Sequence, residues 1–225
     1  MLRWILSVCV VVSVGNIANA HFYFLIPSGN PQPPKLVLAD LPEPDTTVSL
    51  DLALQGKFTS VSKSGDVTPI QPQRGEDGYL TFGVLPAETA TVTGTIDYGV
   101  VIRGQSEPVL ICHHAKLIVS PLIADVQKRL SAPVEITVVT HASGVVFQVT
   151  VNGKPVEADL SVYVPDTKRV EVVRTDAQGM SKPFDKKGQY AARVFVTENR
   201  SGEYQGRAYK QVRHYATVVV VNDRN

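Results

Sequence analysis

The feature that most constrains this chain is a succession of short runs rich in β-branched residues, each bounded by glycine, proline, asparagine or aspartate. Several runs alternate apolar and polar residues with period two, which is typical of half-buried antiparallel strands. The runs cover residues 46–54, 78–85, 89–101, 108–119, 133–141, 144–156, 158–165, 169–179, 188–198 and 212–221. Only residues 121–130 have helical spacing, so the sequence predicts an all-β fold of sandwich type.

The first twenty residues have the layout of a signal peptide. Arg3 precedes an apolar run at 4–15, and the small residues Ala18 and Ala20 follow at the positions that a signal peptidase requires. The apolar run is shorter than the roughly 18 residues that span a bilayer. We therefore expect residues 1–20 to be removed after Ala20, which predicts a periplasmic or secreted protein that is not membrane-spanning after cleavage.

The charge balance bears on nucleic-acid binding, and the cysteine count bears on disulfide formation. Lysine and arginine number 22 against 21 aspartates and glutamates, so no broad basic surface for nucleic acid is expected. Cys9 leaves with the signal peptide, and Cys112 is then the only cysteine of the expected mature chain. An internal disulfide is therefore not expected.

A boundary is predicted near residues 128–133. It divides the mature chain into an N-terminal β domain, residues 21–130, which carries a His-His motif, and a second β domain, residues 131–225. The second domain holds an Asn-Gly hairpin turn at 152–153, then "TDAQG" at 175–179 and "GQY" at 188–190. These turns at these offsets resemble transthyretin-like and carboxypeptidase-regulatory-like sandwiches. The resemblance implies two antiparallel, immunoglobulin-like or transthyretin-like units and says nothing about activity.

A wider resemblance covers most of the expected mature chain. The histidine directly after the predicted cleavage site, the segment "PVLICHHAKLIV" and the ending "GEYQGRAYKQVRHYATV" resemble a bacterial periplasmic family associated with nickel or cobalt uptake. Members commonly begin with His-Asp-Phe-Trp, whereas Phe22, Tyr23 and Phe24 follow His21 here. The resemblance implies metal binding by the N-terminal histidine and a membrane transport component or envelope protein as partner.

His21 would be a chelating residue at a mature N-terminus. Its amine and Nδ1 close a six-membered ring on one metal ion, and the α-amino pKa of about 7.7–8.0 makes proton loss inexpensive. Copper(II) and nickel(II) favour such nitrogen ligands. The alternative is that His21 is only the residue at which cleavage occurs.

Three further candidates lie together at residues 112–114. On a strand, Cys112 and His114 share one face and His113 lies on the other, so a thiol and an imidazole can chelate a thiophilic ion. The alternative is a buried thiol beside two surface imidazoles.

His214 is the last candidate ligand. It shares a strand face with Val212, Ala216 and Val218, which predicts a core position, whereas Tyr215 and Thr217 point the other way. The alternative to a ligand is a hydrogen-bonded core histidine.

Recognisable catalytic motifs are missing from the sequence, including the nucleophile elbow, the phosphate-binding loop and the zinc-protease helix, so we expect no enzyme. The leading hypothesis is an exported carrier or accessory protein that binds nickel, cobalt or copper through His21, with His114, His113 or His214 completing the site. One alternative is a non-catalytic envelope module that recognises protein or glycan. Another is a copper monooxygenase, which usually needs a flat aromatic face, yet the only tryptophan lies in the predicted signal peptide.

Overall fold

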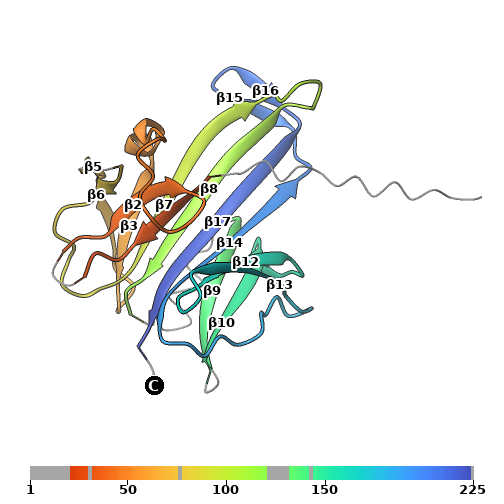
Figure 1. Cartoon of the computed structure of the whole chain (residues 1–225). Helices are drawn as coiled ribbons and strands as arrows, with labels where there is room; N and C mark the ends of the chain where they lie inside the picture. The colour runs from red at the N-terminus through yellow and green to blue at the C-terminus, as the bar shows by residue number, and fades with distance from the viewer. Residues whose placement is uncertain (1–20, 30–31, 76–77, 121–131, 142–143, 224–225) are drawn as a thin grey trace, which may run out of the picture.

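The computed structural model describes the chain from residue 21 to residue 223 with four interior gaps. The described residues are 21–29, 32–75, 78–120, 132–141 and 144–223. The predicted all-β fold is confirmed: the described residues form strands and one short 3-10 helix, η1 (Asp51–Gln55), and no α-helix (Figure 1). The predicted signal peptide and the predicted helical segment 121–130 lie outside the described residues.

An eight-stranded sheet forms the centre of the molecule, in the order β13-β12-β14-β17-β8-β7-β3-β4. Its strands are β3 (Lys57–Ser62), β4 (Val67–Ile70), β7 (Thr89–Val101), β8 (Val109–Ile118), β12 (Asp159–Val164), β13 (Arg169–Arg174), β14 (Gly188–Glu198) and β17 (Gln211–Asn222). Neighbours are antiparallel except β8 and β17, which run parallel from the pair Val109–Gln211 to the pair Ile118–Val220. The central sheet therefore continues across the predicted boundary at residues 128–133.

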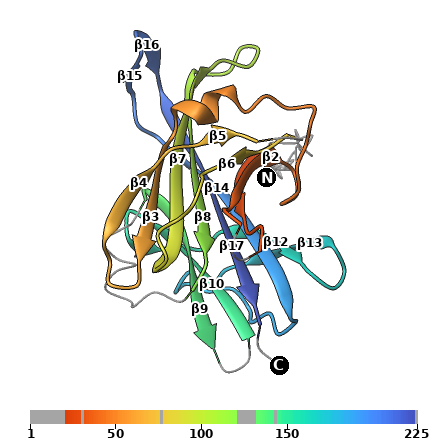
Figure 2. The ribbon, with the colours of Figure 1, turned by 90° about the vertical axis from the view of Figure 1, so that its left-hand side faces the viewer.

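Two smaller sheets cover opposite faces of the central sheet. The first layer is the sheet with the order β1-β2-β6-β5, and the second layer is the sheet with the order β11-β10-β9 (Figure 2). Their strands are β1 (Phe22–Ile26), β2 (Lys35–Ala39), β5 (Gln73–Arg74), β6 (Leu80–Thr81), β9 (Val134–His141), β10 (Gly144–Val151) and β11 (Lys154–Pro155). A separate hairpin, β15 (Gly202–Tyr204) and β16 (Arg207–Tyr209), extends beyond one end of the sheet (Figure 1).

Strand β17 has a buried residue on each face because a hydrophobic core lies on each side of it. Tyr215 and Val219 belong to the core under β1 and β2, whereas Ala216 and Val218 belong to the core under β9 and β10. The sequence predicted only the second of these faces as core. Thr217 connects β17 directly to β1 of the first layer, because its Oγ1 donates a 2.7 Å hydrogen bond to the carbonyl of Tyr23.

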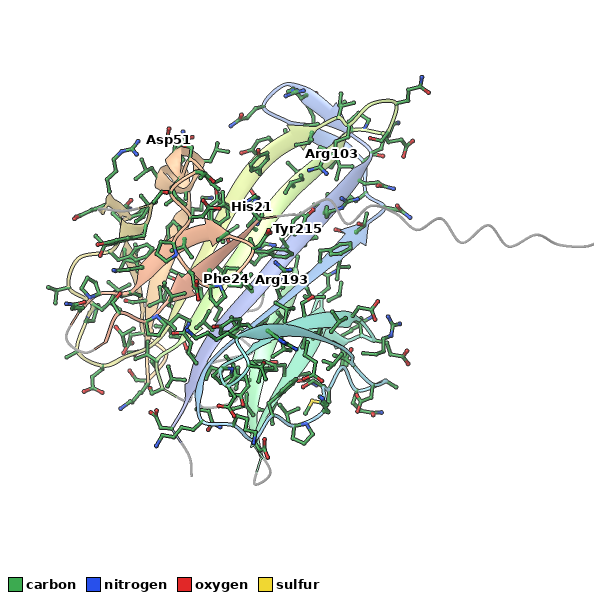
Figure 3. The ribbon with its side chains drawn as sticks, viewed as in Figure 1. His21, Phe24, Asp51, Arg103, Arg193 and Tyr215 are labelled. Atoms are coloured by element: carbon green, nitrogen blue, oxygen red, sulfur yellow. The ribbon has the colours of Figure 1, made fainter. Side chains whose placement is uncertain are left out.

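Arg193 of β14 also joins the first layer to the central sheet. Its guanidinium donates a 2.7 Å hydrogen bond to the carbonyl of Asp40 and lies 4.6 Å from the centre of the Phe22 ring. Figure 3 shows Arg193 pointing from the central sheet towards the first layer. Residues on both sides of the predicted boundary therefore contact one another directly.

The prediction of a strand at 46–54 is wrong, because this segment bends and then forms η1. Asp45 accepts hydrogen bonds from the backbone and hydroxyl of Thr47, and Ser49 accepts one from the backbone of Asp51. Such local side-chain bonds offer the backbone an alternative to a strand ladder. Strands β1 and β2, which the alternation pattern did not predict, are almost wholly buried and carry no period-two pattern.

The turn predictions hold. Asn152 and Gly153 have φ of 49° and 74°, and they connect β10 to β11 as an Asn-Gly hairpin requires. Asp176 of the "TDAQG" turn accepts hydrogen bonds from the backbone amides of Gln178 and Met180. Within the described part of the chain, no helix has the length and apolarity needed to cross a membrane.

Candidate functional site

The predicted metal ligands divide between the two faces of the central sheet. Alternation along β8 places Cys112 and His114 on the β9 side and His113 on the β1 side. His214 of β17 lies on the β9 side with His114, whereas His21 lines a cavity with His113 on the opposite face. The structure therefore brings His114 to His214 and His21 to His113, but it does not bring His21 to His114 or His214.

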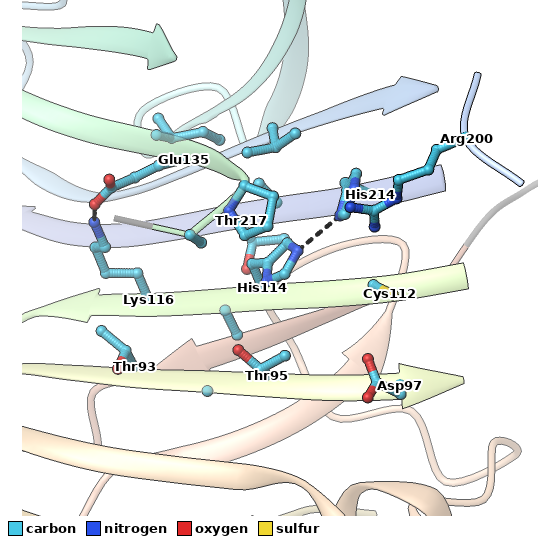
Figure 4. Close-up of a pocket in the computed structure, with 17 residues that line it drawn as sticks. Thr93, Thr95, Asp97, Cys112, His114, Lys116, Glu135, Arg200, His214 and Thr217 are labelled. Carbon is cyan, nitrogen blue, oxygen red and sulfur yellow. Dashed lines mark hydrogen bonds and ion pairs between the residues drawn. The ribbon is translucent and has the colours of Figure 1, made fainter. Parts of the chain in front are cut away.

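His114 and His214 form a direct imidazole pair. Nε2 of His114 lies 3.0 Å from Nδ1 of His214, and the two rings stack at 5.3 Å with an angle of 25° (Figure 4). Both residues are buried, with exposures of 9% and 3%. The contact depends on the parallel pairing of β8 and β17, which sets His214 opposite Cys112, two residues before His114.

Glu198 at the end of β14 favours one tautomer of His214. Its Oε2 lies 3.5 Å from Nε2 of His214 and 3.6 Å from Nε of Arg200. A carboxylate favours a proton on the nitrogen that faces it, and this tautomer leaves the lone pair on Nδ1 of His214. In that tautomer Nδ1 accepts from Nε2 of His114, and this lone pair is the one that a metal ion would use.

Burial keeps the pair neutral. Desolvation, followed by the neighbouring His214, lowers the pKa of His114 to about 4, although Asp97 opposes this shift. Desolvation also lowers the pKa of His214, against the raising effect of Glu198. Neutral imidazole is the form that binds metal, so no proton has to be displaced from a charged ring near pH 7.

The imidazole pair lines a cavity of about 420 Å³ between β7, β8, β17 and the start of β9. Asp97 and Cys112, which are opposite one another on β7 and β8, line the same cavity. Burial, and then the Asp97 carboxylate, raises the pKa of the Cys112 thiol to about 12. The thiol is therefore protonated at neutral pH, and a metal ion would have to displace that proton to bind sulfur.

A buried ion pair lines another part of this cavity. Nζ of Lys116 on β8 donates to Oε1 of Glu135 on β9, and both residues are buried (Figure 4). Burial lowers the pKa of Lys116, and the charge of Glu135 opposes that effect. The pair links the central sheet to the second layer where the two meet.

Among the described residues, no three histidine, cysteine, aspartate or glutamate side chains come together in an arrangement ready to hold a metal ion. The described part of the chain thus offers two imidazoles in direct contact, with Asp97 and Cys112 in the same cavity.

The opposite face carries His113 and His21. His113 is 5% exposed, stacks on Tyr215 at 5.0 Å and meets the edge of Tyr23 at 4.9 Å. The alternative of a buried thiol beside two surface imidazoles is therefore right for Cys112 and wrong for His113 and His114, because a layer covers each face of β8. Desolvation, followed by the neighbouring His114, lowers the pKa of His113 to about 3. His21 is more exposed, and its Nε2 lies 3.7 Å from Oδ2 of Asp45.

Comparison of the sequence with protein-family models and with curated proteins finds no match. The resemblance to the nickel-uptake and cobalt-uptake family accordingly stays a prediction.

Proposed function

We propose that this chain is an exported carrier or accessory protein that binds a transition metal ion, with His114 and His214 as ligands. The observation that carries the proposal is the 3.0 Å separation of Nε2 of His114 and Nδ1 of His214 inside a cavity of about 420 Å³. A metal ion would replace the hydrogen bond between the two nitrogens, and the proton on Nε2 of His114 would move to Nδ1 of the same ring, which has no hydrogen-bond partner.

The type of ligand favours particular ions. Imidazole nitrogens suit copper, nickel and zinc, and copper(II) has the highest affinity in the ordinary order of divalent ions. The 3.0 Å separation is the length of the hydrogen bond that the ion would replace, so it does not select a coordination angle.

The charges around the pair also favour a cation. Asp97, Glu135 and Glu198 are three carboxylates against the two cations Lys116 and Arg200, while the imidazoles are neutral. Glu198 would in addition orient His214 as carboxylates orient many metal-ligating histidines through the second ring nitrogen. These contacts describe binding and orientation only, which suits a carrier or accessory role.

His21 remains a separate candidate ligand, on the other face of the sheet. If cleavage follows Ala20, its amine and Nδ1 form the chelate that the sequence predicts, beside Asp45 at 3.7 Å. The two sites do not depend on one another, so one experiment has to separate them.

The test is calorimetric titration of copper(II), nickel(II) and cobalt(II) into the metal-free protein that begins at His21. We expect one ion per chain, with affinity reduced at least a hundredfold by His114→Gln or His214→Gln. His113→Gln is the matched control, because it removes a buried imidazole from the same strand on the other face. Circular dichroism establishes that each variant is folded.

A chain with one extra residue before His21 distinguishes the two sites. Binding that survives this extension and is lost in the His114 and His214 variants supports the imidazole pair. Loss on extension alone assigns binding to His21 and overturns the imidazole pair as the site. Absence of binding in the folded parent protein overturns the metal-binding function.

The second candidate function is recognition of an envelope protein. It is favoured by β13, which lies at one edge of the central sheet and exposes Val172 at 66% and Val170 at 36%. An exposed apolar edge strand can accept a strand from a partner. Partner binding that is lost in Val172→Lys and unchanged in His114→Gln would favour this function over metal binding.

A further inference from the structure

A second cavity lies on the face of the central sheet opposite the imidazole pair. It measures about 200 Å³ and is bounded by β7, β8 and β17 on one side and by residues of the first layer on the other. His21, Tyr98, Arg103, His113 and Tyr215 are its polar and aromatic lining residues. We propose that this cavity binds a small aromatic monocarboxylate, with the ring among the aromatic side chains and the carboxylate on Arg103.

The walls suit a flat apolar group. His113 and Tyr215 stack at 5.0 Å with an angle of only 17°, and the Tyr98 ring lies 6.4 Å from that of His113. Aliphatic side chains, including those of Val101 and Ile111, complete the lining. Aromatic rings favour stacked or edge-on partners, so these walls would select a planar ring over a flexible chain.

The volume limits the size of the ligand. An apolar cavity of about 150 Å³ is known to accept benzene. The observed volume of about 200 Å³ therefore has room for one six-membered ring with a small substituent.

The positive charge of Arg103 determines which substituent on the ligand ring the cavity would favour. Arg103 presents a guanidinium, which matches a carboxylate with two parallel hydrogen bonds. The nearby carboxylate of Asp45 is already engaged by His21 and Thr47. An anionic group is thus favoured beside Arg103.

The loop between β7 and β8 holds Arg103 in place. The carbonyl of Arg103 accepts hydrogen bonds from the backbone and the hydroxyl of Ser106, at 3.0 and 2.6 Å. The hydroxyl of Ser106 also accepts one from the amide of Arg103 at 3.3 Å. Arg103 lines the same cavity as His21 and Tyr215, and Figure 3 labels all three residues. The backbone of the cation is therefore fixed near the cavity before any ligand arrives.

Neighbouring strands β7 and β8 serve both cavities, but their side chains alternate between them. His113 lines the second cavity, and His114 and Cys112 line the first. Binding of the aromatic acid does not require the metal site, so either proposal can fail without the other.

The test uses benzoate as the probe, with benzyl alcohol as its uncharged analogue. Calorimetry should give one benzoate per chain, and Arg103→Gln should weaken it about tenfold or more. Arg169→Gln, an exposed arginine on β13, is the matched control and should leave the affinity unchanged. Benzyl alcohol should bind more weakly to the parent protein and should not respond to Arg103→Gln.

A second measurement tests the position of the ring. Saturation-transfer NMR should show contact between protein and benzoate ring protons, and Val101→Phe should abolish it by filling the cavity. His114→Gln should retain benzoate binding. Absence of benzoate binding to the folded parent protein overturns the proposal, as does equal binding by the Arg103→Gln variant or by the Val101→Phe variant.

Discussion

At the scale of single residues, burial decides the chemistry of the histidines. His113 and His114 are neighbours in sequence, but each faces a different core, and both lose the water that would stabilise a positive charge. A protein that buries two neutral imidazoles on one strand has stability that depends on pH.

The metal-free protein should be less stable at pH 5 than at pH 7.5. The folded-state pKa values of His113 and His114, about 3 and about 4, lie below the ordinary value of 6.5. The unfolded chain therefore binds protons first. Stability is fully present above pH 6.5 and falls by up to about 1.4 kcal/mol per pH unit for each group as pH drops towards 4.

Urea unfolding at several pH values between 5 and 7.5 measures this slope. The groups that face His113 are Tyr23, Tyr98 and Tyr215, while His214 and Asp97 face His114. His113→Phe should reduce the slope. An unfolding free energy that is constant over this range would contradict the prediction.

The buried Lys116–Glu135 pair gives a second prediction at this scale. Lys116→Met leaves the Glu135 carboxylate buried without its cation, and we expect a loss of about 3–5 kcal/mol in the free energy of unfolding. The double variant Lys116→Met/Glu135→Leu should recover most of that loss, because no uncompensated charge remains. Urea denaturation of the three proteins checks both statements, and equal losses in the single and double variants would count against them.

At the scale of elements, period-two alternation predicted most of the long strands. Residues 89–101 and 188–198 were predicted with the bounds that β7 and β14 have. Alternation failed where both faces are buried, as in β1, and where side chains bond their own backbone, as at 46–54. Alternation identifies a strand that has one buried face and one exposed face, and neither of these segments is such a strand.

The pairing of β3 with β7 depends on a glycine. Gly94 lies opposite Phe58, and a Cβ at position 94 would overlap the Phe58 ring. Gly94→Ala should therefore lower the free energy of unfolding by about 1–3 kcal/mol. Phe58→Leu makes room, so the double variant should lose less than the sum of the two single losses. Additive losses in thermal or urea unfolding would show that the two positions do not interact.

At the scale of the whole molecule, the sequence indicated the candidate ligands but not their grouping. Alternation along one strand correctly separated His113 from His114. The contact between His114 and His214 spans 100 positions and depends on which strands pair and in which register. Hydrophobic periodicity and turn sequences carry no information on which strands pair. For the same reason, the sequence did not identify Glu198 and Asp97 as neighbours of the imidazole pair.

The continuous central sheet predicts that the described part of the chain unfolds as one unit. Residues 132–225 expressed alone would lack β8 and would expose the edge of β17, so we expect them not to fold cooperatively. Urea titration followed by circular dichroism and by tyrosine fluorescence should give coincident single transitions for the chain that begins at His21. Two separate transitions, or a folded 132–225 fragment, would instead support two independent domains.

The position of β17 also has a kinetic consequence. It is the last strand along the described chain, yet it lies in the middle of the central sheet between β14 and β8. Its register with β8 joins segments about a hundred residues apart, and such non-local contacts slow folding because a long loop must close before any pairing is gained. Until β17 docks, β8 presents an open edge to other chains, and the imidazole pair does not exist. The proposed metal site would thus be assembled in the same event that completes the sheet.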